Sequence, residues 1–231
     1  MYQRDYLMRQ IEQAARAVAV ILKQALGGDP DKALAMFDEA YQPLLGISSR
    51  VVSTLTDEQL VSLLTSGSSP DLRRVASVLE VVKAEADVHV LRGDEKAAAT
   101  RYRRALSLAG YLASHSDRLL DAKLAGELVE RTEGLNLTAE QRLARARVLE
   151  ELGRYADAED ALFEAIEAMP DDTGPIDRGI LFYQRLLAKE DGELEAGGLP
   201  RDEVKAGFAE LLRRQVPEEP ASWDDGDPYP S

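Results

Sequence analysis

The fold is decided by a short stretch that reads GRYADAEDALFEAIEAMP from Gly153 to Pro170. Ala158 follows the glycine by five residues, Leu162 by nine and Ala165 by twelve, and a large apolar residue comes directly after. Glycine permits the left-handed backbone of a turn at a helix end, and alanine lets two helices approach closely. The stretch therefore predicts a turn followed by a helix that packs tightly on its predecessor.

The same spacing occurs twice more, so the chain contains three copies of one helix-hairpin pattern. The copies begin at Gly28 (with Ala33, Phe37, Ala40 and Tyr41), at Gly93 (with Ala98, Tyr102, Ala105 and Leu106) and at Gly153. Arrays of such hairpins bury a core between neighbours and present extended surfaces to partners. The pattern favours a binding module, although it does not identify what is bound.

The composition is typical of helices. The chain has 231 residues, of which 45% are hydrophobic and only 6% are aromatic. Ala, Leu, Glu and Arg are abundant, and these side chains lose little rotamer freedom in a helix. Alternating runs of Val, Ile and Thr are nearly absent. We therefore expect an all-α fold with no sheet.

Apolar residues spaced three and four apart predict the individual helices and the domain organisation. The expected helices cover about 2–26, 30–43, 57–64, 70–92, 94–115, 117–131, 138–152, 154–169, 176–189 and 201–215, and residues 48–55 are ambiguous. This gives a helical repeat domain over residues 1–215. Residues 216–231 are rich in acids and poor in apolar anchors, so we expect a disordered acidic tail there.

Short polar motifs predict where several of these helices begin. Thr56 with Gln59, and Thr138 with Gln141, have the spacing of capping boxes. Ser69 is expected to cap the helix whose first residue is Pro70. The sequence Ser116-Asp117 is expected to cap the helix that follows it.

The helix pairs resemble the tetratricopeptide repeat, whose 34-residue units are pairs of antiparallel helices. The second-helix patterns quoted above carry this resemblance, whereas Ala17, Val82 and Arg142 stand where the family has Trp. Because the glycines are 65 and 60 residues apart, one further helix is expected between successive pairs. The resemblance implies an irregular right-handed α-solenoid of about nine or ten helices in antiparallel pairs; a plain helical bundle is the alternative.

A second resemblance concerns the N-terminus. The residues DYLMRQIEQ, from Asp5 to Gln13, resemble the opening of a family of small uncharacterised bacterial proteins of unknown function. The resemblance implies a bacterial protein and adds no chemistry. The alternative is that these residues are simply the start of the first amphipathic helix.

Charge and composition limit the cellular compartments and the classes of binding partner that we expect for this chain. The net charge is −14, and five acids without a base lie beyond residue 215, which leaves −9 for the rest of the chain. Such a field repels phosphate backbones, so we expect no nucleic-acid partner. The longest apolar run, residues 17–22, is far too short for a membrane span. The charged N-terminus and the absence of Cys fit a cytoplasmic protein with no membrane partner.

Patterns of catalytic or metal-binding residues are absent from the sequence. His89 and His115 are the only histidines, and neither has the spacing of metal ligands or of a nucleophile and its base. His89 lies between two valines and is expected to be a buried or partly buried packing residue. There is no phosphate-binding glycine loop. We expect no enzyme activity, no metal and no cofactor.

Four arginines are the candidate partner contacts on the helices. Arg101 and Arg104 lie on the second helix of the second pair, and Arg142 and Arg145 lie on the first helix of the third pair. Residues three apart share a helix face, and first helices are expected to line the concave surface. Their guanidinium groups could bind carboxylates or phosphates of a partner. Surface salt bridges with nearby glutamates are the alternative.

Trp223 is the fifth candidate contact because it is the only Trp in the chain and stands among acids. Such a segment could dock in a basic groove of another protein or of the chain's own helices. An inert solubilising tail is the alternative.

These features predict a non-catalytic protein- or peptide-binding module or scaffold that uses a concave helical surface. One alternative is an all-α enzyme or small-ligand regulator with a site between helix pairs. Another is a homo-oligomeric scaffold joined through the apolar stripe of the first helix. Some tetratricopeptide proteins bind chaperone C-termini through a Lys/Asn clamp, but Val18, Leu22, Leu143 and Arg147 occupy those positions here.

Overall fold

The computed structural model describes residues 2–66, 69–116 and 119–215, and helices dominate this part of the chain. The all-α prediction is therefore confirmed. The helices are α1 (Tyr2–Leu26), α2 (Pro30–Ala35), α3 (Phe37–Leu45), α4 (Ser49–Thr54), α5 (Asp57–Leu63), α6 (Leu72–Arg92), α7 (Glu95–His115), α8 (Ala122–Arg131), α9 (Ala139–Glu151), α10 (Tyr155–Ala168), α11 (Gly174–Leu187), α12 (Asp191–Ala196) and α13 (Arg201–Gln215).

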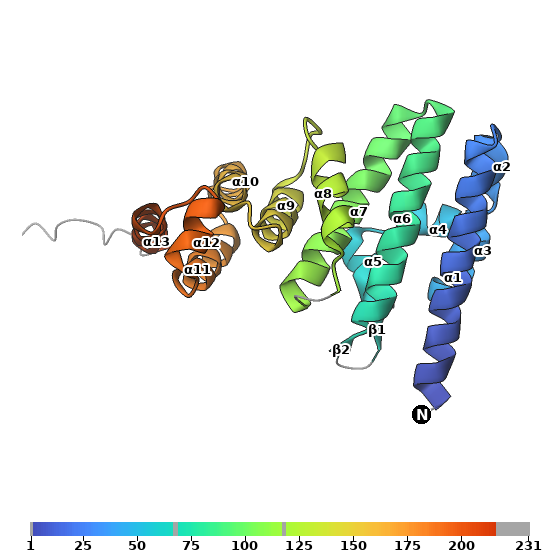
Figure 1. Ribbon diagram of the computed structural model, residues 1–231, viewed down its shortest axis with the longest axis horizontal. Coiled ribbons are helices and arrows are strands. Elements are labelled where there is room, and N and C mark those ends of the chain that lie inside the picture. Colours follow the sequence, from blue (N-terminus) through green and yellow to red (C-terminus); the bar gives the residue numbers. More distant parts are fainter. Residues whose placement is uncertain (1, 67–68, 117–118, 216–231) are drawn as a thin grey trace, which may run out of the picture.

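The helices form an elongated array that runs from α1, α2 and α3 at one end to α13 at the other (Figure 1). Along it, α1 packs on α3 and α6, α6 on α7, α7 on α9, α9 on α10, and α11 on α13. The short α5 lies against α7, and α8 lies against α7 and α9. One continuous cluster of buried side chains, from Ala14 to Leu211, extends through this array.

The three glycine patterns mark tight turns between packed helices, as predicted. Gly28, Gly93 and Gly153 have φ values of 97°, 81° and 72°, so each occupies the left-handed region that favours glycine. They join α1 to α2, α6 to α7, and α9 to α10, which are packed pairs. The alanines and large apolar residues of all three patterns are buried. Their spacing therefore encodes close helix packing.

Local capping explains where several helices begin. The two capping boxes, Thr56 with Gln59 and Thr138 with Gln141, are both present with reciprocal hydrogen bonds. The observed bounds of α1 and α13 agree with the predicted ranges 2–26 and 201–215. Capping groups and apolar periodicity act within a few residues, so the sequence alone reveals them.

The prediction of no sheet was wrong, and so were two of the predicted helix starts. Thr65–Ser66 (β1) pairs antiparallel with Ser69–Pro70 (β2), and α6 begins only after Asp71, whose side chain accepts from the Arg74 N–H. Likewise Asp121, not Ser116-Asp117, caps α8 through the Leu124 N–H. In both places several polar residues could cap a helix, and the paths of the connections select the later one.

The number of helices was also underestimated, since thirteen are present in the described residues against the nine or ten expected. The expected helix 30–43 is divided at Met36 into α2 and α3, and α4 and α12 are six-residue helices that were not predicted. The helix after the third pair, α11, packs mainly on α13, so it begins a further pair.

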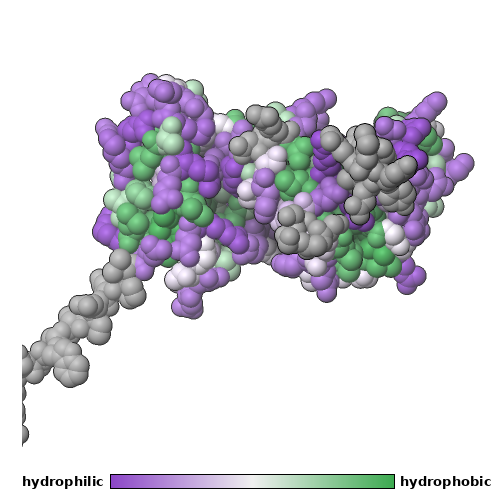
Figure 2. Space-filling model, turned by 90° about the horizontal axis from the view of Figure 1, so that it is seen from below, coloured by the Kyte–Doolittle hydropathy of each residue, from purple (hydrophilic) through white to green (hydrophobic). Residues whose placement is uncertain are grey.

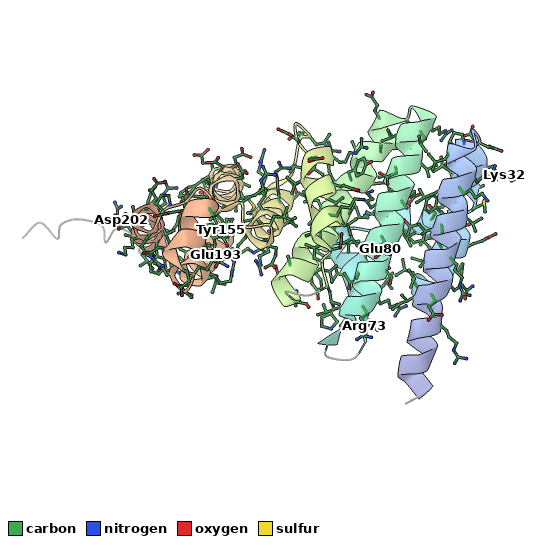
Figure 3. The ribbon with its side chains drawn as sticks, in the orientation of Figure 1. Lys32, Arg73, Glu80, Tyr155, Glu193 and Asp202 are labelled. Carbon is green, nitrogen blue, oxygen red and sulfur yellow. The ribbon has the colours of Figure 1, made fainter. Side chains whose placement is uncertain are left out.

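Tyrosine–carboxylate hydrogen bonds connect successive helices along the array. Tyr41 of α3 donates to Glu85 of α6, and Tyr102 of α7 donates to Asp87 of α6, both at 2.6 Å. Near the other end, Tyr155 of α10 donates to Glu193 of α12 at 2.5 Å (Figure 3). Burial and the adjacent carboxylate raise the pKa of Tyr102 and Tyr155, so both remain donors at neutral pH.

Candidate protein-binding groove

A groove of about 1220 Å³ lies between helices α5, α7, α9 and α11. Four helices that are distant in the sequence supply its walls, and the array brings them together. The face of the molecule seen in Figure 2 carries hydrophobic patches bordered by hydrophilic residues. A surface of this composition can bury apolar groups of a ligand and fix polar ones at the edges.

The floor of the groove depends on a close contact between α7 and α9. A Cβ added at Gly110 would lie 2.5 Å from the Cβ of Ala144, so only glycine permits this helix spacing. Both residues line the groove. Leu108, Leu143 and Phe182 are buried beside them and make the floor apolar.

Aromatic and apolar side chains of α7 and α11 also line the groove. Tyr111 and His115 of α7 stack with ring centroids 4.1 Å apart, and His115 Nδ1 lies 2.7 Å from the Tyr111 carbonyl. We call this pair the aromatic ledge. Leu181 of α11, which also lines the groove, is 52% exposed although it is a large apolar residue. Burying it beneath a ligand would be favourable.

Arginines line the same groove near the ends of α9 and α11. Arg185 forms two hydrogen bonds with Glu150, at 2.6 and 2.8 Å, and Arg147 Nη1 lies 3.3 Å from the same carboxylate. Arg147 also pairs with Glu151 at 2.6 Å. The Glu150 side chain is only 4% exposed, whereas that of Arg185 is 41% exposed. Glu150 therefore orients a guanidinium group that solvent, or a ligand, can reach.

A second arginine of α11 lies at the opposite end of the wall. Arg178 pairs with Glu140 of α9 at 2.6 Å, and both side chains are more than half exposed. Asp57 and Glu58 of α5 contribute carboxylates to the lining. The groove therefore has an apolar interior with charges of both signs around it.

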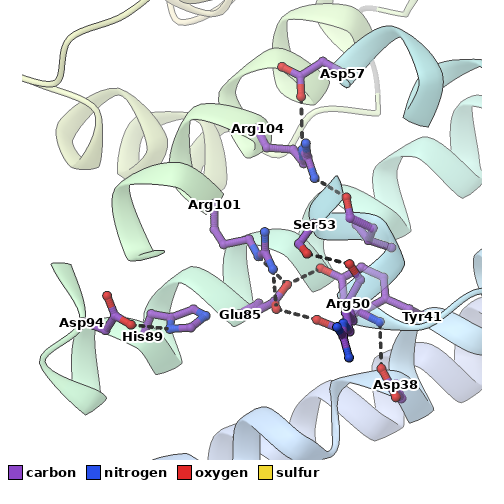
Figure 4. Close-up of polar contacts among 12 residues, drawn as sticks. Asp38, Tyr41, Arg50, Ser53, Asp57, Glu85, His89, Asp94, Arg101 and Arg104 are labelled. Atoms are coloured by element: carbon purple, nitrogen blue, oxygen red, sulfur yellow. Dashed lines mark hydrogen bonds and ion pairs between the residues drawn. The ribbon is translucent and has the colours of Figure 1, made fainter. Parts of the chain in front are cut away.

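Arg101, one of the arginines predicted from the sequence, is part of a buried network instead. Its Nε lies 2.8 Å from Glu85 Oε2, and its Nη2 donates to Oε1 at 3.0 Å (Figure 4). The same carboxylate accepts from Tyr41 at 2.6 Å and from Ser49 at 2.7 Å. Arg101 thus holds α7 against α6, and through Glu85 against α3 and α4.

Arg104 is likewise committed within the chain. Its Nε donates to Asp57 at 3.1 Å, and its terminal nitrogens donate to the carbonyl oxygens of Val52 and Leu55. These acceptors lie in α4, at its C-cap and in α5. Arg104 therefore fastens the α4–α5 segment onto α7.

The Arg142 and Arg145 pair faces away from the groove lining. Arg145 donates to the Val129 carbonyl at 2.8 Å and to Thr132 at 3.0 Å, so it binds the end of α8. Burial lowers the pKa of Arg145. Arg142 lies 3.3 Å from Glu164 of α10. Trp223, the remaining candidate, lies outside the described residues.

The structure places other arginines in the groove, namely Arg147, Arg178 and Arg185. A signal for one of them was present in the sequence, because Leu143, Arg147 and Glu150 are spaced by four and three residues and so share a helix face. No comparable signal identified the two arginines of α11, since their ion pairs with α9 depend on how the chain turns between these helices.

His89 packs within the described helices and has no metal-binding or catalytic partners there. The His89 side chain is partly buried, as expected, and Nδ1 lies 3.9 Å from Asp94. Burial lowers the pKa of His89. Within residues 2–66, 69–116 and 119–215, no three His, Cys, Asp or Glu side chains gather as a metal site would require. In the same part of the chain, no helix combines the length and apolar character needed to cross a bilayer.

Comparisons with known proteins, like the resemblance at the N-terminus, assign no activity to this chain. No curated protein and no solved structure matches the chain. One family model does match, and it covers residues 1–216, which include every helix described above. The chain belongs to DUF6483, a family of unknown function.

Proposed function

We propose that the protein is a non-catalytic binding module whose groove between α5, α7, α9 and α11 takes a peptide segment of a partner protein. The observation that carries this proposal is the exposed Leu181, which lines the same groove of about 1220 Å³ as the aromatic ledge. A large apolar side chain of the peptide inserts between them. Its burial, together with that of Leu181, supplies the main favourable free energy.

The arginines determine which peptides fit. Arg185 is held by Glu150 and its side chain is 41% exposed, so it keeps one orientation, which reduces the entropy lost when it binds a carboxylate. Arg178 is available at the other end of α11, where an exposed Glu140 is its partner. A peptide with one large apolar residue and a nearby Asp or Glu therefore fits best.

The packed helix pairs support a tetratricopeptide-like solenoid, and we include this fold and a cytoplasmic location in the proposal. Such arrays bind partners through surfaces rather than through chemistry of their own. A specific observation favours a second function: Val20 and Leu26 of α1 are exposed at the end of the array. They would suit a homo-oligomeric scaffold.

Selection from a random peptide library tests the main proposal. The library is panned against the full chain, and binding of the enriched peptides is measured for two groove variants, Leu181→Asp and Arg185→Gln. We expect either variant to weaken binding about tenfold or more, as losing one well-placed contact costs about 1–3 kcal/mol. The matched controls are Leu91→Asp and Arg92→Glu, which change exposed residues of α6 outside the groove lining. Equal binding by the groove variants would reject the groove.

A further inference from the structure

We propose that residues 216–231 of this chain occupy the groove themselves, with Trp223 between the aromatic ledge and Leu181. The segment then acts as an internal competitor of the partner peptide. This inference rests on the proposed function because it uses the same groove. It adds a named occupant and a means of regulation.

The point at which the described chain ends supports this occupant. Gln215, the last residue of α13, donates from Nε2 to Asp177 Oδ1 at 2.7 Å. Asp177 lies in the first turn of α11 and directly precedes Arg178, which lines the groove. Residues 216–231 therefore start beside one end of the groove wall that α11 provides.

The lengths also match. Trp223 is eight residues beyond Gln215, and an extended chain of that length reaches about 26 Å. From Arg178 to Arg185 the wall of α11 rises about 10 Å, since a helix advances about 1.5 Å per residue. Trp223 can thus reach Leu181, and the residues after it can reach Arg185.

The chemistry of the segment complements this part of the groove. Trp223 supplies the large apolar group, and Asp224 and Asp225 follow it directly. The partly exposed side chains of Arg178 and Arg185, each of which also pairs with a glutamate, provide partners for these carboxylates. Because the rest of the chain carries a net charge of −9, an acidic segment is repelled from most of its surface. The groove lining also carries Asp57, Glu58, Glu140 and Glu150, so the acidic segment favours the wall of α11, where arginines lie beside the exposed Leu181.

The family model covers the residues that line the groove but not Trp223. The model of the family covers residues 1–216, so it includes the whole groove but ends where this segment begins. The groove therefore belongs to the part of the chain that the family shares. Residues 217–231, which include Trp223, lie beyond the region that the family model covers.

Tethering makes even weak docking effective. A short flexible connection gives an effective concentration of about 1 mM, so an intrinsic Kd of about 0.1 mM would leave the groove about tenfold more often occupied than empty. Removing the Trp223 side chain should therefore strengthen binding of a partner peptide about tenfold.

Fluorescence of the full-length protein tests the arrangement directly, because Trp223 is the only Trp in the chain. Emission and acrylamide quenching are measured for the native protein, for the protein in concentrated urea, and for Leu181→Asp, Arg185→Gln and the control Leu91→Asp. We expect a blue-shifted emission and a several-fold lower quenching constant in the native protein and the control. In both groove variants the values should move toward those in urea.

Three results would overturn the inference. The first is native emission equal to that in urea. The second is shielding that the groove variants leave unchanged, which would place Trp223 elsewhere. The third is shielding that disappears on dilution, which would mean that the segment binds a second copy of the chain.

A parallel titration of library-selected peptides with Trp223→Ala separates this inference from the proposed function. If those peptides bind the groove but Trp223 is solvated, only the internal competitor is rejected. If Trp223 is shielded by the groove but Trp223→Ala binds no peptide, only the partner-binding function is rejected.

Discussion

Two buried glutamates in different regions of the array have opposite surroundings. Glu85 and Glu150 have side chains that are each only 4% exposed, and each binds an arginine through both carboxylate oxygens. The arginine on Glu85, Arg101, is 11% exposed, whereas Arg185 on Glu150 is 41% exposed. The chain thus encloses the Arg–Glu ion pair at Glu85, whereas the ion pair of the same kind at Glu150 is open to a groove.

The α4–α5 segment accounts for this difference. Ser49 of α4 binds Glu85, and Arg104 of α7 holds the segment through Asp57 and two carbonyl oxygens. The chain therefore covers its own ion pair around Glu85, while the described residues leave the groove around Glu150 open. A covered ion pair stabilises one arrangement of helices, and an open one is available for recognition.

Replacing Glu85 should give the largest loss of stability, and the matching change at Glu150 tests this comparison directly. Glu85→Ala leaves Arg101 buried without its carboxylate and removes the acceptor of Tyr41, so we expect a loss of about 3–5 kcal/mol in the free energy of unfolding. Glu150→Ala should cost about 1 kcal/mol, because Arg185 can be hydrated and Arg147 keeps Glu151. Urea unfolding monitored by circular dichroism measures both. Equal losses would contradict the distinction between the enclosed and open regions.

Adding one methyl group at Gly110, in the floor of the groove, should destabilise the protein. Gly110→Ala places a Cβ 2.5 Å from that of Ala144, so α7 and α9 must separate, at a cost of about 1–3 kcal/mol. Gly126 of α8 is the matched control, since a Cβ there meets nothing within 4 Å. Gly126→Ala should stabilise the protein by up to about 1 kcal/mol, because alanine favours helices. Thermal unfolding compares the two, and a stabilising Gly110→Ala would refute the close contact.

The enclosed region should also show a modest dependence on pH through His89. Burial holds the pKa of His89 below its usual 6.5, while Glu85 and Asp94 oppose this shift and Arg101 and Arg92 add to it. The unfolded chain therefore takes up a proton first as pH falls, and stability decreases below about pH 6.5.

The variant His89→Gln isolates this contribution. Its unfolding free energy should fall less than that of the native protein between pH 7 and pH 5, when both are measured by urea titration in the same buffers. A pH dependence that is identical in the two proteins would show that His89 does not contribute.

The smallest effect on stability is expected at the exposed rim of the groove. Arg178→Gln removes an ion pair with Glu140 in which both partners are largely solvated, so the unfolding free energy should change by less than about 0.5 kcal/mol. Binding of an acidic peptide should nevertheless weaken severalfold, as titration calorimetry can measure. A large loss of stability with unchanged affinity would mean that Arg178 is structural.

Local signals in the sequence predicted much of the fold and little of the groove. The turns at Gly28, Gly93 and Gly153 and both capping boxes depend on neighbouring residues, so they could be read from spacing. The break at Met36 and the start of α8 depend on how the chain is connected in space, and both were missed.

The candidate contacts show the same limit. The spacing of Arg142 and Arg145 predicted one shared helix face, but spacing does not reveal which neighbouring helix each side chain meets. The answer is α10 for Arg142 and the end of α8 for Arg145. Identifying Arg185 requires knowing that α11 lies beside α9, which follows from the packing of the whole array.

The most direct test of the groove is a methyl NMR titration of Leu- and Val-labelled protein with a library-selected peptide. If the peptide binds the groove, the methyl signals of Leu143 and Leu181 shift as it is added, while those of Val20, Leu26 and Leu91 do not. Shifts confined to Val20 and Leu26 would place binding on α1 at the end of the array and would contradict the assignment of the groove as the partner-binding surface.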